Sequence, residues 1–279
     1  MDRISFWKMH GLGNDFIVID NRNGQLPEKD LGKITEKLCK RYFSIGADGS
    51  LILCNSEVAD VKMRIFNADG TEAETSGNGI RCFAKYCYEK GVAKKKEIKI
   101  ETLAGVKTVW VETDKGKVSQ VMVDMGEPVF DKPRIPVVGD GTCVNEDLNV
   151  DDASFKVTCV SVGNPHCIIF VEDVNSFPVG TYGPKIETHK MFPARINVEF
   201  VQYLNRKELK MRVWERGVGE TMACGTGACA SVAAANLLGK VDSPCTVHLL
   251  GGDLKIQLKD KNILMTGPAE KAFEGVVEL

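Results

Sequence analysis

The 279-residue sequence contains no run of about 18 apolar residues, which is the length that a membrane-spanning helix requires. Its first residues lack the basic segment and following apolar segment of a secretion signal. The formal net charge is −2, so the chain as a whole has no strong attraction to nucleic acid or to an anionic membrane. We therefore expect a cytoplasmic protein that has neither nucleic acid nor a membrane as a partner.

Motifs for common cofactors and metals are also missing. The sequence has no G-x-G-x-x-G fingerprint, no P-loop and no C-x-x-C pair. A chain of this length can bury a core without pairing its ten cysteines in a disulfide framework. The C-x4-C spacing of Cys82 with Cys87 and of Cys224 with Cys229 fits no common zinc pattern. We expect reduced and mostly buried thiols, no metal and no cofactor; a lysine that binds pyridoxal phosphate is compatible with the pattern alone.

What the sequence does contain is an internal duplication. Residues 64–91 align without a gap with residues 212–239. The identical pairs are Arg64/Arg212, Glu72/Glu220, Gly77/Gly225, Gly79/Gly227 and Gly91/Gly239. Aligning residues 13–20 with residues 163–170 also places Asn14 on Asn164. We interpret the chain as two homologous halves related by a pseudo-twofold axis; the alternative is coincidence combined with the usual residue preferences of helix ends.

Each half has the same order of predicted elements. A run with the apolar alternation of a half-buried strand, at 60–67 and again at 208–215, precedes a glycine-rich turn. A helix follows each turn and ends at Gly91 or Gly239, because glycine is preferred just after a helix. The second helix is apolar on every side, so we expect it to be buried all round.

Short strands separated by Gly, Pro and Asp turns make up the rest of the sequence. We predict an α+β fold of two pseudo-symmetric lobes, each a mostly antiparallel, barrel-like sheet around a central helix, with the active site in the cleft between them. The N-terminal lobe would comprise residues 1–124 and 269–279, and the C-terminal lobe would comprise residues 125–268.

Ser76 and Cys224 occupy the same position in the two turns, directly before the helix. A helix N-terminus presents free N–H groups and a partial positive charge that attracts anions. This setting is expected to lower the pKa of a cysteine from about 8.5 toward neutrality, so Cys224 is a candidate reactive thiol; the alternative is an inert, buried cysteine. Two such turns facing one cleft would place an acid and a base on opposite faces of an amino-acid α-carbon, the geometry that its inversion requires, with N–H groups holding the carboxylate.

Seven segments resemble the diaminopimelate epimerase family. In order along the chain they are KMHGLGNDF, FNADGTEAE, GNGIRCFAKY, VGNPHC, FPARIN, ERGVGET and ACGTGACA, and together they are far more specific than any one alone. The resemblance implies a cofactor-independent isomerase of lysine biosynthesis that converts LL- to meso-diaminopimelate, with two similar lobes and a homodimeric assembly. It makes Cys224 one of two proton-transfer residues, puts Ser76 at the position of the other, and adds His166 and Glu215 as their flanking groups.

The resemblance also implies a set of substrate contacts. These are Asn14, Asn67, Gly77, Asn78, Asn164, Asn197, Glu215, Arg216, Gly225 and Thr226. Asparagine offers donors and acceptors to an amino-acid head group, and arginine can bind a carboxylate through two hydrogen bonds. Structural alternatives exist: asparagines beside turns often form those turns, His166 would suit a hydrogen-bonded core position, and Glu215 with Arg216 could be a surface pair.

Ser76 departs from the family, which usually has a cysteine at this position. A hydroxyl is a much weaker acid than a thiol, and a helix dipole does not close that gap. Three interpretations follow: a cysteine replaced to trap substrate, a natural epimerase or dehydratase with an unequal pair or another amino-acid substrate, and a protein that only binds its amino acid. A cysteine hydrolase is a weaker alternative, because it has no use for a duplicated turn.

Overall fold

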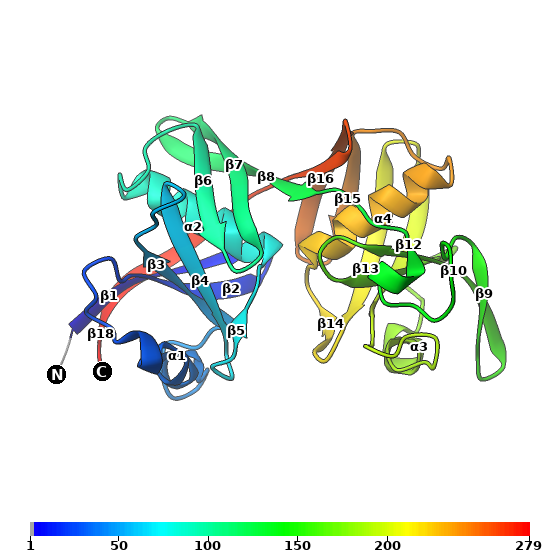
Figure 1. Ribbon diagram of the computed structural model, residues 1–279, viewed down its shortest axis with the longest axis horizontal. Helices are drawn as coiled ribbons and strands as arrows, with labels where there is room; N and C mark the ends of the chain where they lie inside the picture. Colours follow the sequence, from blue (N-terminus) through cyan, green and yellow to red (C-terminus); the bar gives the residue numbers. More distant parts are fainter. Residues whose placement is uncertain (1–2) are drawn as a thin grey trace. The chain divides into compact units, whose positions relative to one another are not determined.

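The computed structural model describes residues 3–279 and divides into two compact units (Figure 1). The first unit consists of Met1–Asp124 and Thr266–Leu279, and the second of Met125–Met265. The chain therefore leaves the first unit once and returns to it with its last strand. No helix within residues 3–279 is long and apolar enough to cross a membrane.

The first unit is a mixed sheet that surrounds one helix. Its strands are β1 (Arg3–Gly11), β2 (Asn14–Asp20), β3 (Gly49–Cys54), β4 (Val61–Asn67), β5 (Glu72–Ala73), β6 (Glu97–Thr102), β7 (Gly105–Asp114), β8 (Lys117–Gly126) and β18 (Glu270–Glu278). β2 pairs with β3 and β4 with β6 in parallel, whereas β18–β1–β2, β3–β4–β5 and β6–β7–β8 are antiparallel. Helix α2 (Gly77–Glu89) contacts β1, β2, β3, β4 and β7, and helix α1 (Leu31–Cys39) packs on β3 and β4.

The second unit has the same arrangement. Its strands are β9 (Glu146–Val150), β10 (Ala153–Ser161), β11 (Pro165–Phe170), β12 (Asn197–Asn205), β13 (Glu208–Glu215), β14 (Gly219–Thr221), β15 (Cys245–Leu249), β16 (Gly252–Lys259) and β17 (Asn262–Gly267). β11 pairs with β12 and β13 with β15 in parallel, and β9–β10–β11, β12–β13–β14 and β15–β16 are antiparallel. Helix α4 (Gly225–Leu237) contacts six of these strands, and helix α3 (Val179–Glu187) packs on β9, β12, β13 and β14.

Strand by strand, the second unit repeats the first. In each, an antiparallel pair is followed by an outer helix, a parallel strand, an antiparallel hairpin, a central helix and a second parallel pairing. An ion pair recurs at the same place: Arg64 Nε lies 2.7 Å from Glu72 Oε1, and Arg212 Nε lies 2.7 Å from Glu220 Oε1. The predicted α+β fold of two pseudo-symmetric lobes is therefore confirmed.

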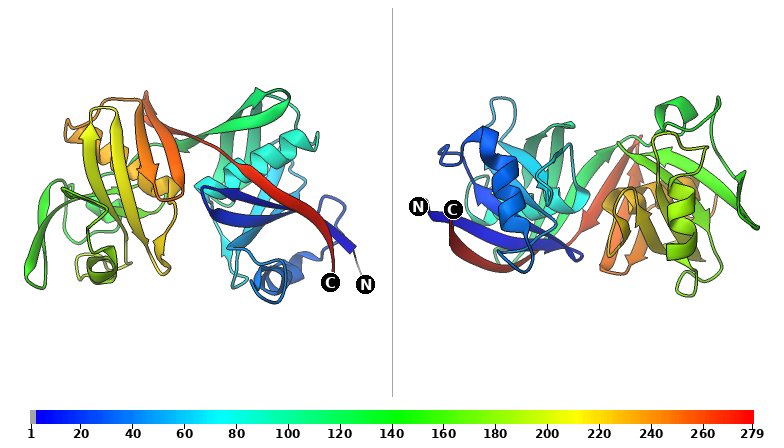
Figure 2. Two further views of the ribbon diagram at one scale, coloured as in Figure 1. Left: turned by 180° about the vertical axis from the view of Figure 1, so that it is seen from behind. Right: turned by 90° about the horizontal axis from the view of Figure 1, so that it is seen from below.

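Both central helices begin and end where the sequence predicts. Ser76 and Cys224 are the N-cap residues, and each side chain accepts a hydrogen bond from the backbone N–H three residues further on. Gly91 and Gly239 follow the helix ends with φ of 73° and 69°, a conformation that glycine adopts without strain. The two further views in Figure 2 show each helix lying against the strands of its own unit.

Helix α2 is more deeply buried than its amphipathic sequence indicates. All residues of Gly77–Cys87 are buried, including Arg81 and Lys85. The guanidinium of Arg81 donates to the carbonyls of Pro268 and Gly77, and Lys85 Nζ donates to the carbonyl of Val118. These bonds satisfy charged groups that would otherwise be costly to bury. Helix α4 is buried over Gly225–Ala235 as predicted, with small residues and no charged group.

The cysteines confirm the expectation of reduced, mostly buried thiols. Within residues 3–279 none of the ten forms a disulfide. Nine are buried, and Cys54 is half-buried. Because most of these side chains lie in the two cores, they act there as small apolar groups.

Candidate active site

The Cys224 turn presents a buried thiol at the start of α4. Its backbone is extended, with φ of −114°, and the residue is 6% exposed. The Sγ atom accepts a hydrogen bond from Gly227 N at 3.3 Å and lies 3.4 Å from Thr226 Oγ1. The predicted turn residues Gly225 and Thr226 form the first turn of the helix, and the backbone N–H that reaches the sulfur comes from Gly227.

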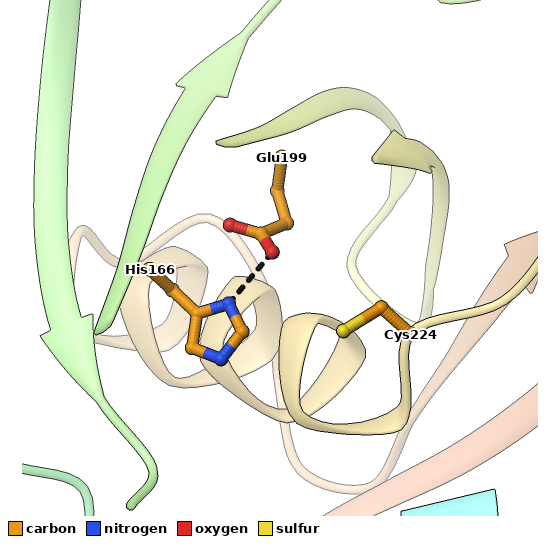
Figure 3. Close-up of side chains that lie close together, drawn as sticks. All are labelled: His166, Glu199 and Cys224. Carbon is orange, nitrogen blue, oxygen red and sulfur yellow. Dashed lines mark hydrogen bonds and ion pairs between the residues drawn. The ribbon is translucent and has the colours of Figure 1, made fainter. Parts of the chain in front are cut away.

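His166 lies beside this thiol and is hydrogen-bonded on both ring nitrogens. It occupies β11, opposite Asn197 of the parallel strand β12. Its Nδ1 lies 2.7 Å from Glu199 Oε1, and both side chains are fully buried (Figure 3). Its Nε2 lies 2.9 Å from Asn164 Oδ1, and Asn164 Nδ2 donates to Thr226 Oγ1 at 3.2 Å. A chain of contacts therefore runs from Glu199 to the Cys224 turn.

Glu199 is a site residue that the sequence analysis missed. It stands two residues after Asn197 on β12, so both side chains point to the same face of the sheet. One polar atom from each of His166, Glu199 and Cys224 lies within 4.8 Å of the other two. The only sequence signal is an acidic residue within the otherwise apolar run VEFV. Within this cluster His166 and Glu199 are hydrogen-bonded to each other.

Glu215 approaches the thiol from the end of β13. It accepts a hydrogen bond from the hydroxyl of Thr221, and its carboxylate also contacts the Cys224 thiol. Burial raises the pKa of Glu215, and the hydrogen bond from Thr221 only partly opposes this effect. A carboxyl group with a raised pKa can hold a proton nearer to neutral pH, which is what acid–base chemistry requires.

The prediction of a lowered pKa for Cys224 is wrong. Burial, followed by the negative charges of Glu215 and Glu199, raises the pKa of this thiol well above its ordinary value. Hydrogen bonds from Thr226 and from the backbone N–H of Gly227 act in the opposite direction but are weaker. The helix N-terminus is present, but desolvation and two nearby carboxylates outweigh it, so the resting side chain is a protonated thiol.

Asn197 and Arg216 are joined at the edge of this cluster. Asn197 is buried; its Nδ2 donates to the carbonyl of Pro165 at 2.8 Å, and its Oδ1 accepts from Arg216 N at 2.9 Å. Arg216 itself is exposed, and its guanidinium reaches only the carbonyl of Ala194, at 3.3 Å. Asn197 thus fixes the loop backbone, while the charge of Arg216 stays accessible.

Ser76 heads the corresponding turn in the first unit. Its Oγ accepts a hydrogen bond from Gly79 N at 3.0 Å, and Gly77 and Asn78 are buried in the first turn of α2. Asn78 Nδ2 donates to Asn14 Oδ1 at 3.2 Å. Two predicted substrate contacts, Asn14 and Asn78, therefore lie next to each other close to the serine turn.

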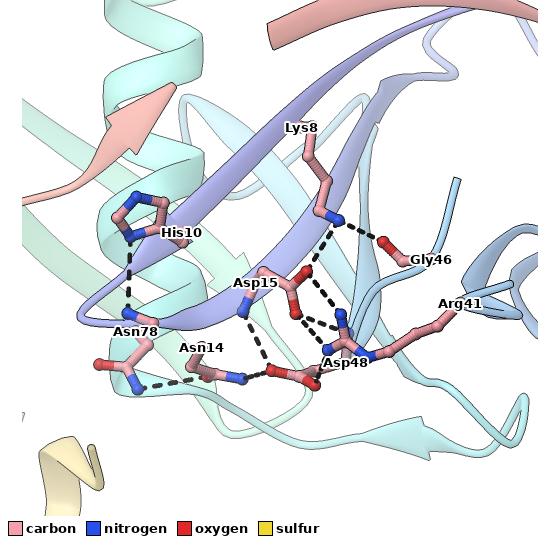
Figure 4. Close-up of polar contacts among 9 residues, drawn as sticks. Lys8, His10, Asn14, Asp15, Arg41, Gly46, Asp48 and Asn78 are labelled. Atoms are coloured by element: carbon pink, nitrogen blue, oxygen red, sulfur yellow. Dashed lines mark hydrogen bonds and ion pairs between the residues drawn. The ribbon is translucent and has the colours of Figure 1, made fainter. Parts of the chain in front are cut away.

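A charged network holds Asn14 in place (Figure 4). Asn14 Nδ2 donates to Asp48 Oδ2 at 2.8 Å, and Arg41 Nη2 bridges Asp48 and Asp15 at 2.6 and 2.7 Å. Lys8 Nζ lies 2.7 Å from Asp15 Oδ2. Although burial acts to raise it, these partners lower the pKa of Asp15 to about 2. The Asp15 carboxylate therefore stays charged, and the hydrogen bond to Asp48 orients the amide of Asn14.

Asn67 is the predicted contact with the weakest connection to this group. It is exposed at the end of β4, and its Nδ2 donates to Thr71 Oγ1 at 3.0 Å. The next residue, Ala68, donates its N–H to the carbonyl of Asp48.

The predicted site residues form two groups, one in each unit. The first unit holds Asn14, Asn67, Ser76, Gly77 and Asn78, and the second holds Asn164, His166, Asn197, Glu215, Arg216, Cys224, Gly225 and Thr226.

Comparison with known proteins gives a consistent result. The family model described as diaminopimelate epimerase matches residues 6–130 and 158–272. The diaminopimelate epimerase of Moorella thermoacetica is 51% identical over 273 residues, covering 97% of this chain and 98% of the relative. That of Pelotomaculum thermopropionicum is 52% identical over 272 residues, covering 97% of both.

Solved structures with much lower sequence identity share the fold. A PhzF-family phenazine biosynthesis protein from Bacillus anthracis superposes with a TM-score of 0.73 at 18% identity, over 100% of both chains. A hydroxyproline epimerase from Agrobacterium vitis superposes with a TM-score of 0.71 at 15% identity, over 99% of this chain and 91% of the other. At these identities the likeness concerns the fold alone.

Proposed function

Because the chain belongs to the diaminopimelate epimerase family, we propose that it is an amino-acid epimerase that interconverts LL- and meso-diaminopimelate in lysine biosynthesis, without a cofactor. The observation that carries the proposal is the duplicated helix-start turn, with Cys224 in one copy and Ser76 in the other. The Cys224 copy has three ionisable neighbours suited to proton transfer, namely His166, Glu199 and Glu215. We further propose that the protein is a cytoplasmic homodimer.

The proposed chemistry is proton removal from one face of the α-carbon and proton return to the other. A thiolate at Cys224 takes the α-proton, the electron pair of the broken C–H bond moves into the substrate carboxylate, and the second turn returns a proton to the opposite face. In the reverse direction the Cys224 thiol is the donor. The N–H groups of both turns stabilise the negative charge that develops on the carboxylate.

The remaining polar residues would recognise the two amino-acid head groups of the substrate. Asn14, Asn78 and Asn164 offer amides close to the turns, and exposed Arg216 offers a bidentate partner for the distal carboxylate. Asn67, exposed at the end of β4, would contact the substrate from the first unit. Asn197 acts indirectly, because both ends of its amide are bonded to backbone.

Ser76 limits this function, since a serine hydroxyl is too weakly acidic to replace a thiol. We propose that the protein as it stands epimerises slowly. The protein would be an epimerase whose cysteine has been replaced, an enzyme that works with an unequal pair or on another amino acid, or a protein that only binds.

Proton NMR of LL- and meso-diaminopimelate in D2O distinguishes these interpretations, with the protein and its Ser76→Cys variant compared at equal concentration. If Ser76→Cys gains fast interconversion, by about 100-fold or more, the epimerase proposal holds. If neither form exchanges the α-proton while hydroxyproline or another amino acid reacts, the substrate assignment is wrong. Saturable binding of diaminopimelate without deuterium uptake in either form, unaffected by alkylation of Cys224, would instead support a binding protein.

A further inference from the structure

The two units differ in the strand residues that pack against the start of the central helix. In the first unit, Phe16 of β2 stands beside Gly49 of β3, and Leu51 follows two residues later. In the second unit, His166 of β11 stands beside Asn197 of β12, and Glu199 follows two residues later. The same two positions of the duplicated sheet therefore carry an apolar pair in one unit and an acid–base pair in the other.

One member of each pair lies directly under a glycine in the first turn of the helix. A Cβ atom on Gly79 would lie 3.1 Å from Leu51 Cδ2, and a Cβ atom on Gly227 would lie 2.6 Å from Glu199 Oε1. Glu199 thus replaces a core leucine at the base of the thiol-bearing helix. It is fully buried, and its Oε2 has no hydrogen-bond partner among residues 3–279. A buried carboxylate with one partner is costly unless that partner is charged.

The hydrogen bonds of His166 indicate which charge it carries. Nδ1 faces Glu199 Oε1, and Nε2 faces Asn164 Oδ1, whose amide nitrogen is turned to Thr226. A carboxylate oxygen and an amide oxygen both accept hydrogen bonds, so each ring nitrogen faces an acceptor, which is the arrangement that suits an imidazolium. The other ionisable groups facing the ring are Glu215 of β13 and Cys224 at the start of α4.

We propose that Glu199 is a positioning residue of the epimerase reaction: it holds His166 as an imidazolium beside Cys224, and the positive charge of the ring stabilises the Cys224 thiolate that takes the α-proton. The inference rests on the proposed function for its catalytic consequence, but the His166–Glu199 pair can be tested without it. This role accounts for the difference between the units: the second has His166 and Glu199 at the two sheet positions where the first has the apolar residues Phe16 and Leu51.

The experiment compares Glu199→Gln with the unchanged protein. Glutamine keeps an oxygen that can accept the bond from Nδ1, but it lacks the charge. The charge state of His166 is measured by the ring 15N chemical shifts of histidine-labelled protein at neutral pH, with His166→Gln used to assign the signal among the four histidines. We expect an imidazolium in the parent and a neutral ring in Glu199→Gln.

The kinetic readout is α-proton exchange of diaminopimelate in D2O. We expect Glu199→Gln to lower the exchange rate at saturating substrate by about 100-fold, the scale of acid–base catalysis, with little change in KM. Glu146→Gln is the matched control, because Glu146 is also a paired carboxylate of the second unit, with Lys132 as its partner; it should leave both readouts unchanged.

Two results would overturn the inference. One is a neutral His166 in the parent protein, and the other is a Glu199→Gln variant that keeps both the imidazolium signal and the exchange rate. If the parent shows the imidazolium and Glu199→Gln loses it, but neither form exchanges the α-proton of diaminopimelate, the His166–Glu199 pair stands and the proposed function fails. The two failures are therefore distinguishable.

Discussion

Opposing influences act on the pKa of Cys224, and their balance decides whether its side chain is a thiol or a thiolate. A helix N-terminus favours the thiolate, whereas burial and the charges of Glu215 and Glu199 favour the thiol. The second set dominates in the protein without substrate. A protonated thiol is protected against oxidation and alkylation at neutral pH, and it becomes reactive only when the balance of charge around it changes.

A Glu215→Gln substitution tests this balance. Removing the carboxylate charge lowers the pKa of Cys224, so a larger fraction is thiolate at any pH below that pKa, and alkylation by iodoacetamide begins to rise at lower pH than in the parent. The measurement is the alkylation rate of Cys224 against pH by peptide mass spectrometry, with half-buried Cys54 as an internal reference.

The same variant should nevertheless be a poorer enzyme. Glu215 is lost as an acid–base partner, so we expect α-proton exchange to fall by about 100-fold even though Cys224 is more readily ionised. An alkylation profile that moves to higher pH, or does not move at all, would show that the charge of Glu215 does not act on the thiol.

At the scale of the element, the start of each central helix depends on a close contact with the strand behind it. Alanine at Gly79 would meet Leu51 Cδ2 and Ser76 Cβ at 3.1 Å, whereas alanine at Gly227 would meet Glu199 Oε1 at 2.6 Å. The apolar contact is tight but needs only a small adjustment. The polar contact requires Glu199 to move, which would break its hydrogen bond to His166.

We therefore expect Gly79→Ala and Gly227→Ala to differ in function more than in stability. Alanine in a helix gains up to about 1 kcal/mol over glycine, which offsets part of the crowding in both. Gly227→Ala should lose most of its exchange activity, although its free energy of unfolding should stay within about 2 kcal/mol of that of the parent. Gly79→Ala should keep its activity. Urea unfolding and the D2O exchange assay provide the two measurements; equal losses of activity in both variants would contradict the role given to Glu199.

The elements also show where sequence reasoning succeeds and where it stops. The duplication, the two helix starts and the glycines that end the helices were predictable because they depend on local residue preferences. Glu199 was not, because its role depends on the parallel register of β11 and β12, which brings His166 beside a residue 33 positions away. The direction of the Cys224 pKa shift was predicted wrongly for a similar reason: the helix start is local, but the burial of the thiol and the charge of Glu199 depend on how the strands pack around it.

At the scale of the whole molecule, the two halves are alike in fold and unequal in chemistry. One unit has a thiol with His166, Glu199 and Glu215 around it, and the other has a serine above an apolar pair. If Cys224 removes the α-proton of one stereoisomer, protonation of the resulting carbanion by Ser76 is slow, because a serine hydroxyl is a weak acid. Cys224 then returns a proton to the face from which it was taken, after exchange with solvent.

This inequality predicts exchange without inversion. In D2O, one stereoisomer of diaminopimelate should take up α-deuterium at least about 100-fold faster than it is converted to the other, and the other stereoisomer should exchange slowly. Cys224→Ser should abolish the fast exchange. Ser76→Ala should leave it within about twofold, at a cost of about 1 kcal/mol in stability, because the serine caps α2 but is not the base. Equal and fast exchange from both stereoisomers would mean that the serine turn is a competent base, and the halves would then be equal in chemistry as well as in fold.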